Sequence, residues 1–290
     1  MAQKMRFRVK YLFGAAALTL LLYVVIRLIF ISPSNDREWK TEHAVMPSAE
    51  FSGTLVHVKN IRNFSYRSGG EFTPAYQDRI FDLEKIESVW FVLSPFVPGW
   101  RGPAHGFLSF GFADSQFVSI SVEARKEPGE SYSILKGLVN TYELIYVIGD
   151  ERDLVGLRAV YWDDPVYVFP IKTGKERIRA LFVDMLERAN KLRESPEFYN
   201  TFTSNCATNL YEHANKLNPG KWSSFSWKLI LPGYADELIY EKGVLDTELT
   251  LLEARERFKV NERAKKFIDS PNFSLDIRQV NTLSRSSYRK

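Results

Sequence analysis

The sequence predicts an α+β fold, in which a mostly antiparallel sheet is packed with helices and one transmembrane helix precedes the domain. Three observations lead to this prediction. A long apolar run lies near the N-terminus, β-branched and aromatic runs bounded by glycine, proline and aspartate fill the first half of the chain, and helical periodicity follows. Of the 290 residues, 45% are hydrophobic, which is enough apolar material for one sizeable core.

The apolar run covers residues 11–32 and, as a helix, is long enough to cross a bilayer. Basic residues stand before it at positions Lys4, Arg6, Arg8 and Lys10. Because positive flanks stay inside, residues 1–10 are expected to form a cytoplasmic stub and the rest to be exported. The run is longer than an ordinary signal-peptide core and Ser32-Pro33-Ser34 is a poor cleavage site, so we expect an uncleaved, single-pass anchor in the inner membrane.

The charge and cysteine content exclude several classes of protein. The formal net charge is +4, and the four basic residues before the apolar run supply all of it, so the exported part is about neutral and no nucleic-acid partner is expected. Cys206 is the only cysteine, and the four histidines lack ligand spacing. We therefore expect no intramolecular disulfide, no metal site and no cofactor.

Beyond the membrane segment, three regions follow one another. Residues 33–51 are polar, contain two prolines and are predicted to be a linker. Residues 52–280 are expected to form one exported domain, and residues 281–290 a basic tail. From residue 270 the chain is expected to be loosely held. Strands are expected at 51–61, 88–96, 105–112, 116–125, 142–149 and 166–171, and helices at 175–193, 206–216, 236–240 and 247–257.

Cys206 is the candidate nucleophile. Ser204 or Asn205 is a suitable N-cap, which puts Cys206 in the first turn of a helix, where the dipole and free backbone N–H groups favour a thiolate. The backbone N–H of Cys206, assisted by Asn205 or Thr203, is expected to stabilise an oxyanion. Against this stands the commoner role of a lone cysteine as a small buried hydrophobic residue.

His105 is the candidate base, because it opens a predicted strand directly after a turn, and a strand-end imidazole beside a helix-start thiol is the papain-like arrangement. His213 lies two helical turns beyond the cysteine and is expected to be a packed or capping residue. His57, on a strand, ranks behind His105, and His43 falls in the predicted linker and is discounted.

A third residue is expected to orient the imidazole. Ser119, Ser121 and Glu123 share one face of the following strand, and Glu123 is the strongest acceptor, although an exposed charge beside Arg125 is an equally good interpretation. Other charged residues are expected to form structural ion pairs or solvated surface rather than a head-group site. These residues are Arg62, Arg67, Asp150, Glu151, Arg152, Asp153 and Arg158.

With these residues, the chain resembles the periplasmic domain of the Lnb family. The resemblance rests on PAHGFLSFGF, SISVEAR, YELIYVIGDERDLVGLR, PEFYNTFTSNCATNLYEHAN and LPGYADELIY, and it runs through most of residues 52–280. That family includes Gram-positive lipoprotein intramolecular transacylases, so the resemblance implies acyl transfer through a cysteine thioester. The order of His105 and Cys206 is also similar to circularly permuted NlpC-like enzymes, which implies a permuted papain-like core.

The expected function is that of a membrane-anchored periplasmic acyltransferase or hydrolase, with a Cys206–His105 dyad and a lipid or lipoprotein substrate. The Gram-positive transacylases carry several further membrane helices, whereas this chain has one apolar span, which leaves transfer and hydrolysis both open. Two alternatives remain: a cell-wall amidase or peptidase with the same dyad, and a non-enzymatic envelope scaffold. The sequence does not specify the oligomeric state.

Overall fold

The computed structural model describes residues 2–97, 99, 101–218 and 226–279, and the predicted basic tail at 281–290 lies outside them. Its strands are β1 (Ser48–Ser52), β2 (Leu55–Arg62), β3 (Ser65–Tyr66), β4 (Phe72–Thr73), β5 (Tyr76–Asp82), β6 (Ile86–Pro95), β7 (Ala104–Phe112), β8 (Phe117–Arg125), β9 (Glu143–Gly149) and β10 (Tyr167–Pro170). Its α-helices are α1 (Ala2–Phe30), α2 (Glu151–Gly156), α3 (Lys175–Glu194), α4 (Cys206–Leu217), α5 (Ala235–Glu241), α6 (Leu251–Phe258), α7 (Asn261–Phe267) and α8 (Phe273–Asp276).

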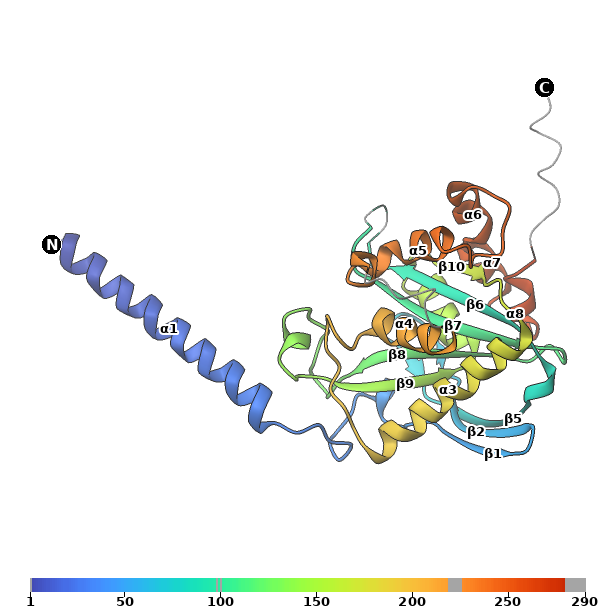
Figure 1. Ribbon diagram of the computed structural model, residues 1–290, viewed down its shortest axis with the longest axis horizontal. Coiled ribbons are helices and arrows are strands. Elements are labelled where there is room, and N and C mark those ends of the chain that lie inside the picture. Colours follow the sequence, from blue (N-terminus) through green and yellow to red (C-terminus); the bar gives the residue numbers. More distant parts are fainter. Residues whose placement is uncertain (1, 98, 100, 219–225, 280–290) are drawn as a thin grey trace, which may run out of the picture.

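The predicted α+β class is confirmed. The main sheet has eight strands in the order β1-β2-β9-β8-β7-β6-β10, and β5 pairs with β2 off this path (Figure 1). Its pairs are antiparallel except for β2 with β9, which run parallel where Arg62 meets Gly149. The sheet is therefore mostly antiparallel, as its alternating strand sequences predict.

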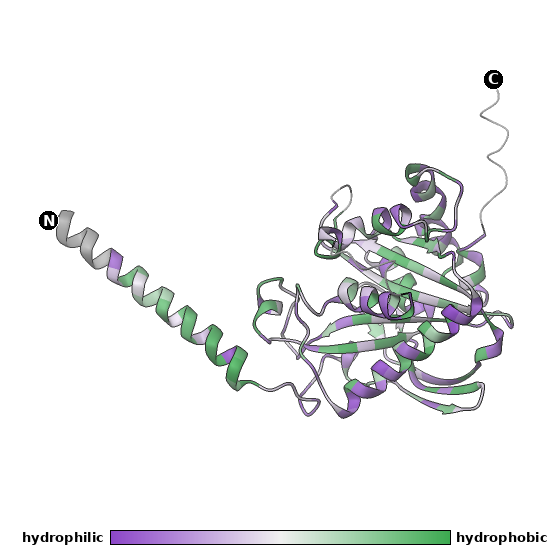
Figure 2. Ribbon diagram, viewed as in Figure 1, coloured by the Kyte–Doolittle hydropathy of each residue, from purple (hydrophilic) through white to green (hydrophobic). Residues whose placement is uncertain are grey.

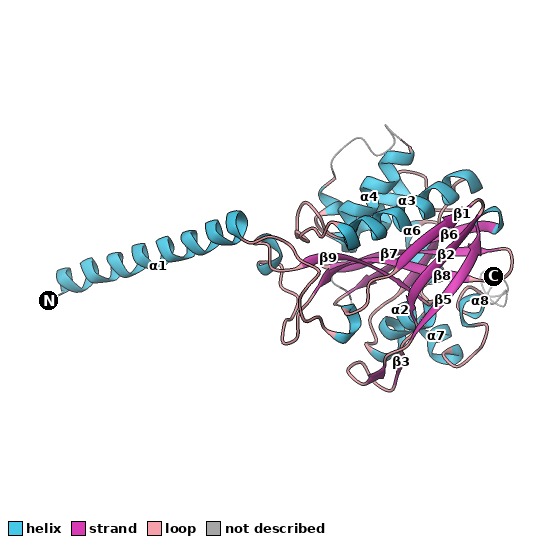
Figure 3. Ribbon diagram, turned by 90° about the horizontal axis from the view of Figure 1, so that it is seen from below, coloured by secondary structure: helices cyan, strands magenta, loops and turns pink. Residues whose placement is uncertain are grey.

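Helices cover both faces of the sheet, which gives three layers. Figure 3 shows α3 and α4 on one side and α2, α7 and α8 on the other. Side chains alternate between the two sides along β7, so that Phe107 packs with the cluster that includes α2, α7 and α8, and Leu108 packs with the cluster that includes α3. All nine residues of β7 are buried, which explains its nearly continuous apolar sequence.

The N-terminal helix α1 projects away from the domain (Figure 1) and is apolar along most of its length (Figure 2). Its segment Lys10–Phe30 has a mean hydropathy of 2.3 and is long and apolar enough to cross a membrane. At the outer end, Arg27 Nε donates to the backbone oxygen of Val139 at 3.2 Å, and the same guanidinium donates to that of Asn140. The end of α1 therefore contacts the loop before β9.

The segment 33–51, predicted to be a linker, packs against the domain. The side-chain amide of Asn35 donates to the backbone oxygen of Leu192 at 2.9 Å, and the guanidinium of Arg125 lies 4.1 Å from the ring centroid of Trp39. Further on, His43 is buried and the segment ends as β1, which pairs with β2. Contacts with neighbouring elements, which local composition does not encode, hold this polar stretch in place.

Candidate active site

The helix α4 begins at Cys206 because Asn205 caps it. Asn205 Oδ1 accepts from the backbone N–H of Thr208 at 2.9 Å, and Thr208 Oγ1 accepts from the backbone N–H of Asn205 at 2.8 Å, which completes a capping box. Of the two caps that the sequence offers, the structure uses Asn205. Cys206 is thus in the first turn of α4, as predicted.

The side chain of Asn205 makes structural hydrogen bonds at both ends of its amide. Besides its capping oxygen, its Nδ2 donates to the backbone oxygen of Thr201 at 2.6 Å. The amide nitrogen has a second N–H, and Asn205 lines the cavity at Cys206, so assistance to an oxyanion stays a prediction. Thr203 is exposed, and among the described residues the lining of the cavity at Cys206 includes Thr201 and Phe202 but not Thr203.

Cys206 and His105 line the same cavity, of about 440 Å³, although they come from opposite faces of the sheet. Gly106 faces α4, so the alternation along β7 turns His105 to the other face. The pairing of β8 with β7 runs from Leu108 to Gly111, which leaves the edge of β7 at His105 and Gly106 open. Through this gap the two side chains reach one cavity. Among the described residues, no hydrogen bond joins the imidazole to the sulfur.

The imidazole of His105 is oriented by β8. Its Nε2 lies 2.6 Å from Ser121 Oγ, and Ser121 Oγ donates its proton to Glu123 Oε1 at 2.9 Å. The hydroxyl must therefore accept from Nε2–H, so the network assigns the Nε2–H tautomer and leaves the lone pair on Nδ1. Glu123 Oε1 itself is 3.7 Å from Nε2. Glu123, the predicted orienting residue, is thus connected to the imidazole through Ser121.

Glu123 is a partly buried carboxylate at the centre of a charged cluster. His43 Nε2 lies 3.2 Å from its Oε2, and Arg158 donates to its Oε1 at 3.3 Å. Burial raises the pKa of Glu123. The hydrogen bond with His43 and the positive charge of Arg158 lower it by more, so the pKa lies well below its ordinary range. His43 and Arg158 were not expected at the site, and no local sequence pattern marks either.

Burial keeps both dyad candidates neutral. It lowers the pKa of His105 to about 3, with help from the charge of Arg158, and it raises the pKa of Cys206. The backbone N–H groups of Gly106 and Ala207 face the sulfur and oppose the second shift in part. The stabilisation of a thiolate that the helix start predicts is therefore outweighed by desolvation.

The other candidate residues lie elsewhere. His213 is buried between Tyr146, whose hydroxyl is 2.8 Å from its Nε2, and Asp184, whose carboxylate is 2.7 Å from its Nδ1, in agreement with a packing role. His57 is on β2, half-exposed, 3.9 Å from a carboxylate oxygen of Asp78. Within the described part of the chain, no group of three His, Cys, Asp or Glu side chains is arranged to hold a metal ion.

The charged residues around α2 form structural ion pairs. Arg62 binds Asp153 through two hydrogen bonds of 2.9 and 3.0 Å, and Arg278 binds Glu151 at 2.6 Å. Both carboxylates are fully buried. The expected structural role therefore fits these residues, with the exception of Arg158, which lines the cavity at Cys206.

The structure is an α+β domain that follows one apolar helix and has a candidate thiol site, where a buried cysteine and a buried histidine line one cavity. The model of the Lnb N-terminal periplasmic domain family matches residues 72–233, more than half of the chain, and the chain belongs to this family. The match includes His105, Glu123 and Cys206. Searches of curated proteins and of solved structures found no match. The family and α1 together fit a single-pass membrane protein with a periplasmic domain.

Proposed function

We propose that this protein is a cysteine-dependent acyltransferase or hydrolase, held at the inner membrane by α1. Cys206 is the nucleophile and His105 is the base. The observation that carries the proposal is that both residues line one cavity while Ser121 and Glu123 orient the imidazole. Because burial keeps the thiol and the imidazole neutral, the proton in this proposal moves to His105 only as the sulfur attacks.

The chemistry follows from these roles. The Cys206 sulfur attacks the carbonyl carbon of an ester or amide while its proton passes to Nδ1 of His105. The bond to the leaving group then breaks, the leaving oxygen or nitrogen takes the proton from His105, and a thioester remains. An amine, hydroxyl or water attacks the thioester, His105 accepts its proton, and the sulfur is protonated again as it leaves.

Backbone N–H groups are the candidate oxyanion donors. The N–H of Cys206 lies at the start of α4, and the N–H of Gly106 faces the sulfur from the open edge of β7. The proposal rests on these two groups, since Asn205 caps α4 with its side-chain oxygen.

The surroundings of the cavity favour a lipid or lipoprotein substrate. Exposed apolar side chains at its wall include Ile134, Phe202, Ile230 and Leu231. The outer end of α1 binds Val139, which is close in sequence to Ile134. An apolar rim near the end of a membrane helix suits an acyl donor better than it suits a peptide of the cell wall.

The test is the pH dependence of Cys206 alkylation in the full-length protein in detergent, comparing wild type with His105→Ala. Iodoacetamide reports on one position, because the chain has a single cysteine. We expect His105→Ala to react at least about tenfold more slowly at neutral pH, since the base is lost. The two rates should converge at high pH, where the thiolate forms without help. His57→Ala, on β2, is the matched control and should behave as wild type.

Other results of the alkylation experiment would favour other functions. Equal rates for wild type and His105→Ala at neutral pH would contradict the dyad. A thiol that reacts only after unfolding would favour an envelope scaffold. If the dyad is confirmed, a hydroxylamine-sensitive adduct on Cys206 after incubation with phospholipid or lipopeptide supports acyl transfer. Release of amine from wall fragments, without such an adduct from lipids, supports the amidase alternative.

A further inference from the structure

A second cavity, of about 170 Å³, runs along α4 beside the candidate thiol. One face of the helix lines it from the first turn to the last, at positions that recur every three or four residues. The interval from Ala207 to Leu217 is ten residues, or about 15 Å of helix axis. The helix contributes Ala207, Leu210, Tyr211, Ala214 and Leu217.

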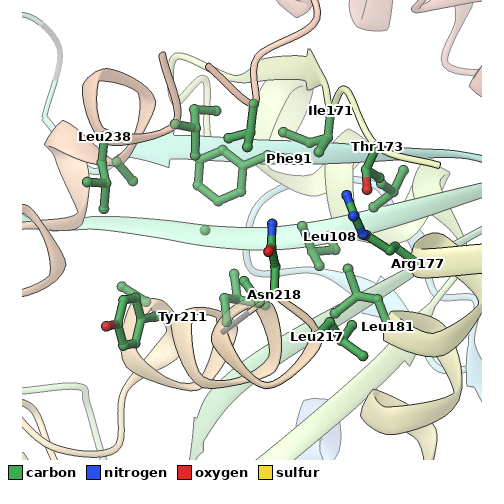
Figure 4. Close-up of a pocket in the computed structure, with 18 of the residues that line it drawn as sticks. Phe91, Leu108, Ile171, Thr173, Arg177, Leu181, Tyr211, Leu217, Asn218 and Leu238 are labelled. Carbon is green, nitrogen blue, oxygen red and sulfur yellow. The ribbon is translucent and has the colours of Figure 1, made fainter. Parts of the chain in front are cut away.

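The opposite walls of this cavity are apolar as well. They come from β6 and β7 through Phe91 and Leu108, and from α5 through Leu238 (Figure 4). Polar side chains are confined to Thr173, Arg177 and Asn218, with Lys172 near them in the chain. In Figure 4 these three labelled polar residues lie toward the Leu217 end of α4, away from Tyr211. The cavity is thus an apolar channel with a polar end far from Cys206.

Residues that line the channel are sequence neighbours of the two candidate dyad residues. Gly106 lines the channel, while its neighbour His105 lines the cavity at the thiol. In the same way Ala207 lines the channel and its neighbour Cys206 lines the other cavity, and Pro232 lines both. The sulfur and the near end of the channel are therefore one residue apart along α4.

We propose that this channel binds the unbranched alkyl chain of the acyl group that Cys206 carries. The inference rests on the proposed function for the position of the carbonyl, and it adds where the rest of the acyl group lies. A linear alkyl chain is the occupant that fits, because the channel is long, of small volume and apolar between its ends. The polar residues at the far end would limit the length of chain that is buried.

The experiment alkylates Cys206 of the full-length protein in detergent with N-alkyl iodoacetamides of increasing chain length. Wild type, Ala214→Trp and Glu212→Trp are compared under the same conditions, so that partition of the reagents into micelles affects all three equally. Ala214 is in the channel, and Glu212 is exposed on the same helix. The readout is the ratio of the long-chain rate to the N-ethyl rate.

In wild type the ratio should rise by up to about fourfold for each methylene that becomes buried, and then level off. Glu212→Trp should keep this rise. Ala214→Trp should flatten it, because the indole fills the middle of the channel. A ratio that is flat in wild type, or that is the same in wild type and Ala214→Trp, would overturn the channel.

A second measurement separates this inference from the proposed function. Cys206→Ala has no nucleophile, yet it should still bind a fluorescent fatty-acid analogue, and the double variant Cys206→Ala/Ala214→Trp should bind it at least tenfold more weakly. Binding that follows this pattern supports the channel even if Cys206 proves unreactive with every reagent. Equal binding by both variants overturns the channel and leaves the dyad test unaffected.

Discussion

Ser121 lies between His105 and Glu123, with its oxygen 2.6 Å from the imidazole Nε2 and its proton given to the carboxylate. The serine fixes which nitrogen of the imidazole carries the proton. A carboxylate in direct contact would hold the imidazole more tightly and would favour its charged form. The intervening hydroxyl instead suits an imidazole that stays neutral until a proton arrives from the thiol.

Ser121→Ala should slow alkylation of Cys206 at neutral pH by about tenfold, which corresponds to the loss of one hydrogen bond of ~1.4 kcal/mol. Ser119→Ala is the matched control, because Ser119 is two residues away on β8 and its buried hydroxyl has no hydrogen-bond partner among the described residues. Alkylation rates of the two variants provide the comparison. If both variants react as wild type does, Ser121 has no role in orienting the base.

The buried, neutral His105 makes the protein sensitive to mild acid. Its pKa is about 3 in the folded protein against 6.5 when free, so between these values the unfolded chain binds one more proton. The contribution of His105 to the free energy of unfolding is therefore fully present above about pH 6.5. It is lost as the pH falls toward 3, at ~1.4 kcal/mol per pH unit.

The pH dependence of urea unfolding tests this shift. His105→Gln should show a slope of unfolding free energy against pH that is smaller by about one proton between roughly pH 6 and pH 4. His57→Gln, on β2 and outside the cavity at Cys206, serves as the control for the substitution of a histidine by glutamine. Identical slopes for all three proteins would mean that His105 is not held neutral.

Asn205 is expected to support the helix rather than the chemistry. Asn205→Ala should lower the free energy of unfolding by about 1 kcal/mol, because the N-cap acceptor is lost, whereas Asn205→Ser should recover most of it. Urea unfolding measures both. If the amide instead stabilised an oxyanion, Asn205→Ser would fold normally and lose roughly a hundredfold in acylation rate.

The Arg62–Asp153 pair should be essential for folding. Asp153→Ala leaves the guanidinium of Arg62 buried without its carboxylate and should destabilise the protein by about 3 to 5 kcal/mol. Removing the exposed carboxylate partner in Glu71→Ala, which ends a surface pair with Arg67, should produce no measurable change. A small effect of Asp153→Ala on urea unfolding would show that water reaches Arg62.

Much of the fold could be predicted from local pattern. Runs such as 105–112 and 116–125 became β7 and β8, and the helix predicted at 175–193 is α3, whose buried Phe182, Met185 and Leu186 lie on the predicted face. Other elements were missed or misplaced because polar residues weaken their hydrophobic pattern. β5 alternates too weakly to be recognised, α6 begins at Leu251 instead of 247, and the stretch after 270 is held by α8 and by Arg278 on Glu151.

In the candidate site, the sequence marks only those residues whose position in a helix or strand is itself the signal. A helix-start cysteine and a strand-start histidine can be found in sequence, and so can the serine and glutamate on one face of β8. His43 and Arg158 could not be found this way, because they reach Glu123 from distant parts of the chain. The sequence also did not reveal that the pKa of Cys206 is raised, because the burial that raises it depends on the whole fold.

The packing of residues 35–43 determines where the folding unit begins. This stretch joins α1 to the domain, and its contacts with Leu192, Arg125 and Glu123 are part of the domain itself. A protease that cut just before β1 would therefore release a domain without the histidine that hydrogen-bonds Glu123. Such a cut would also remove one of the groups that lower the pKa of Glu123, whereas a cut before residue 33 would keep this contact.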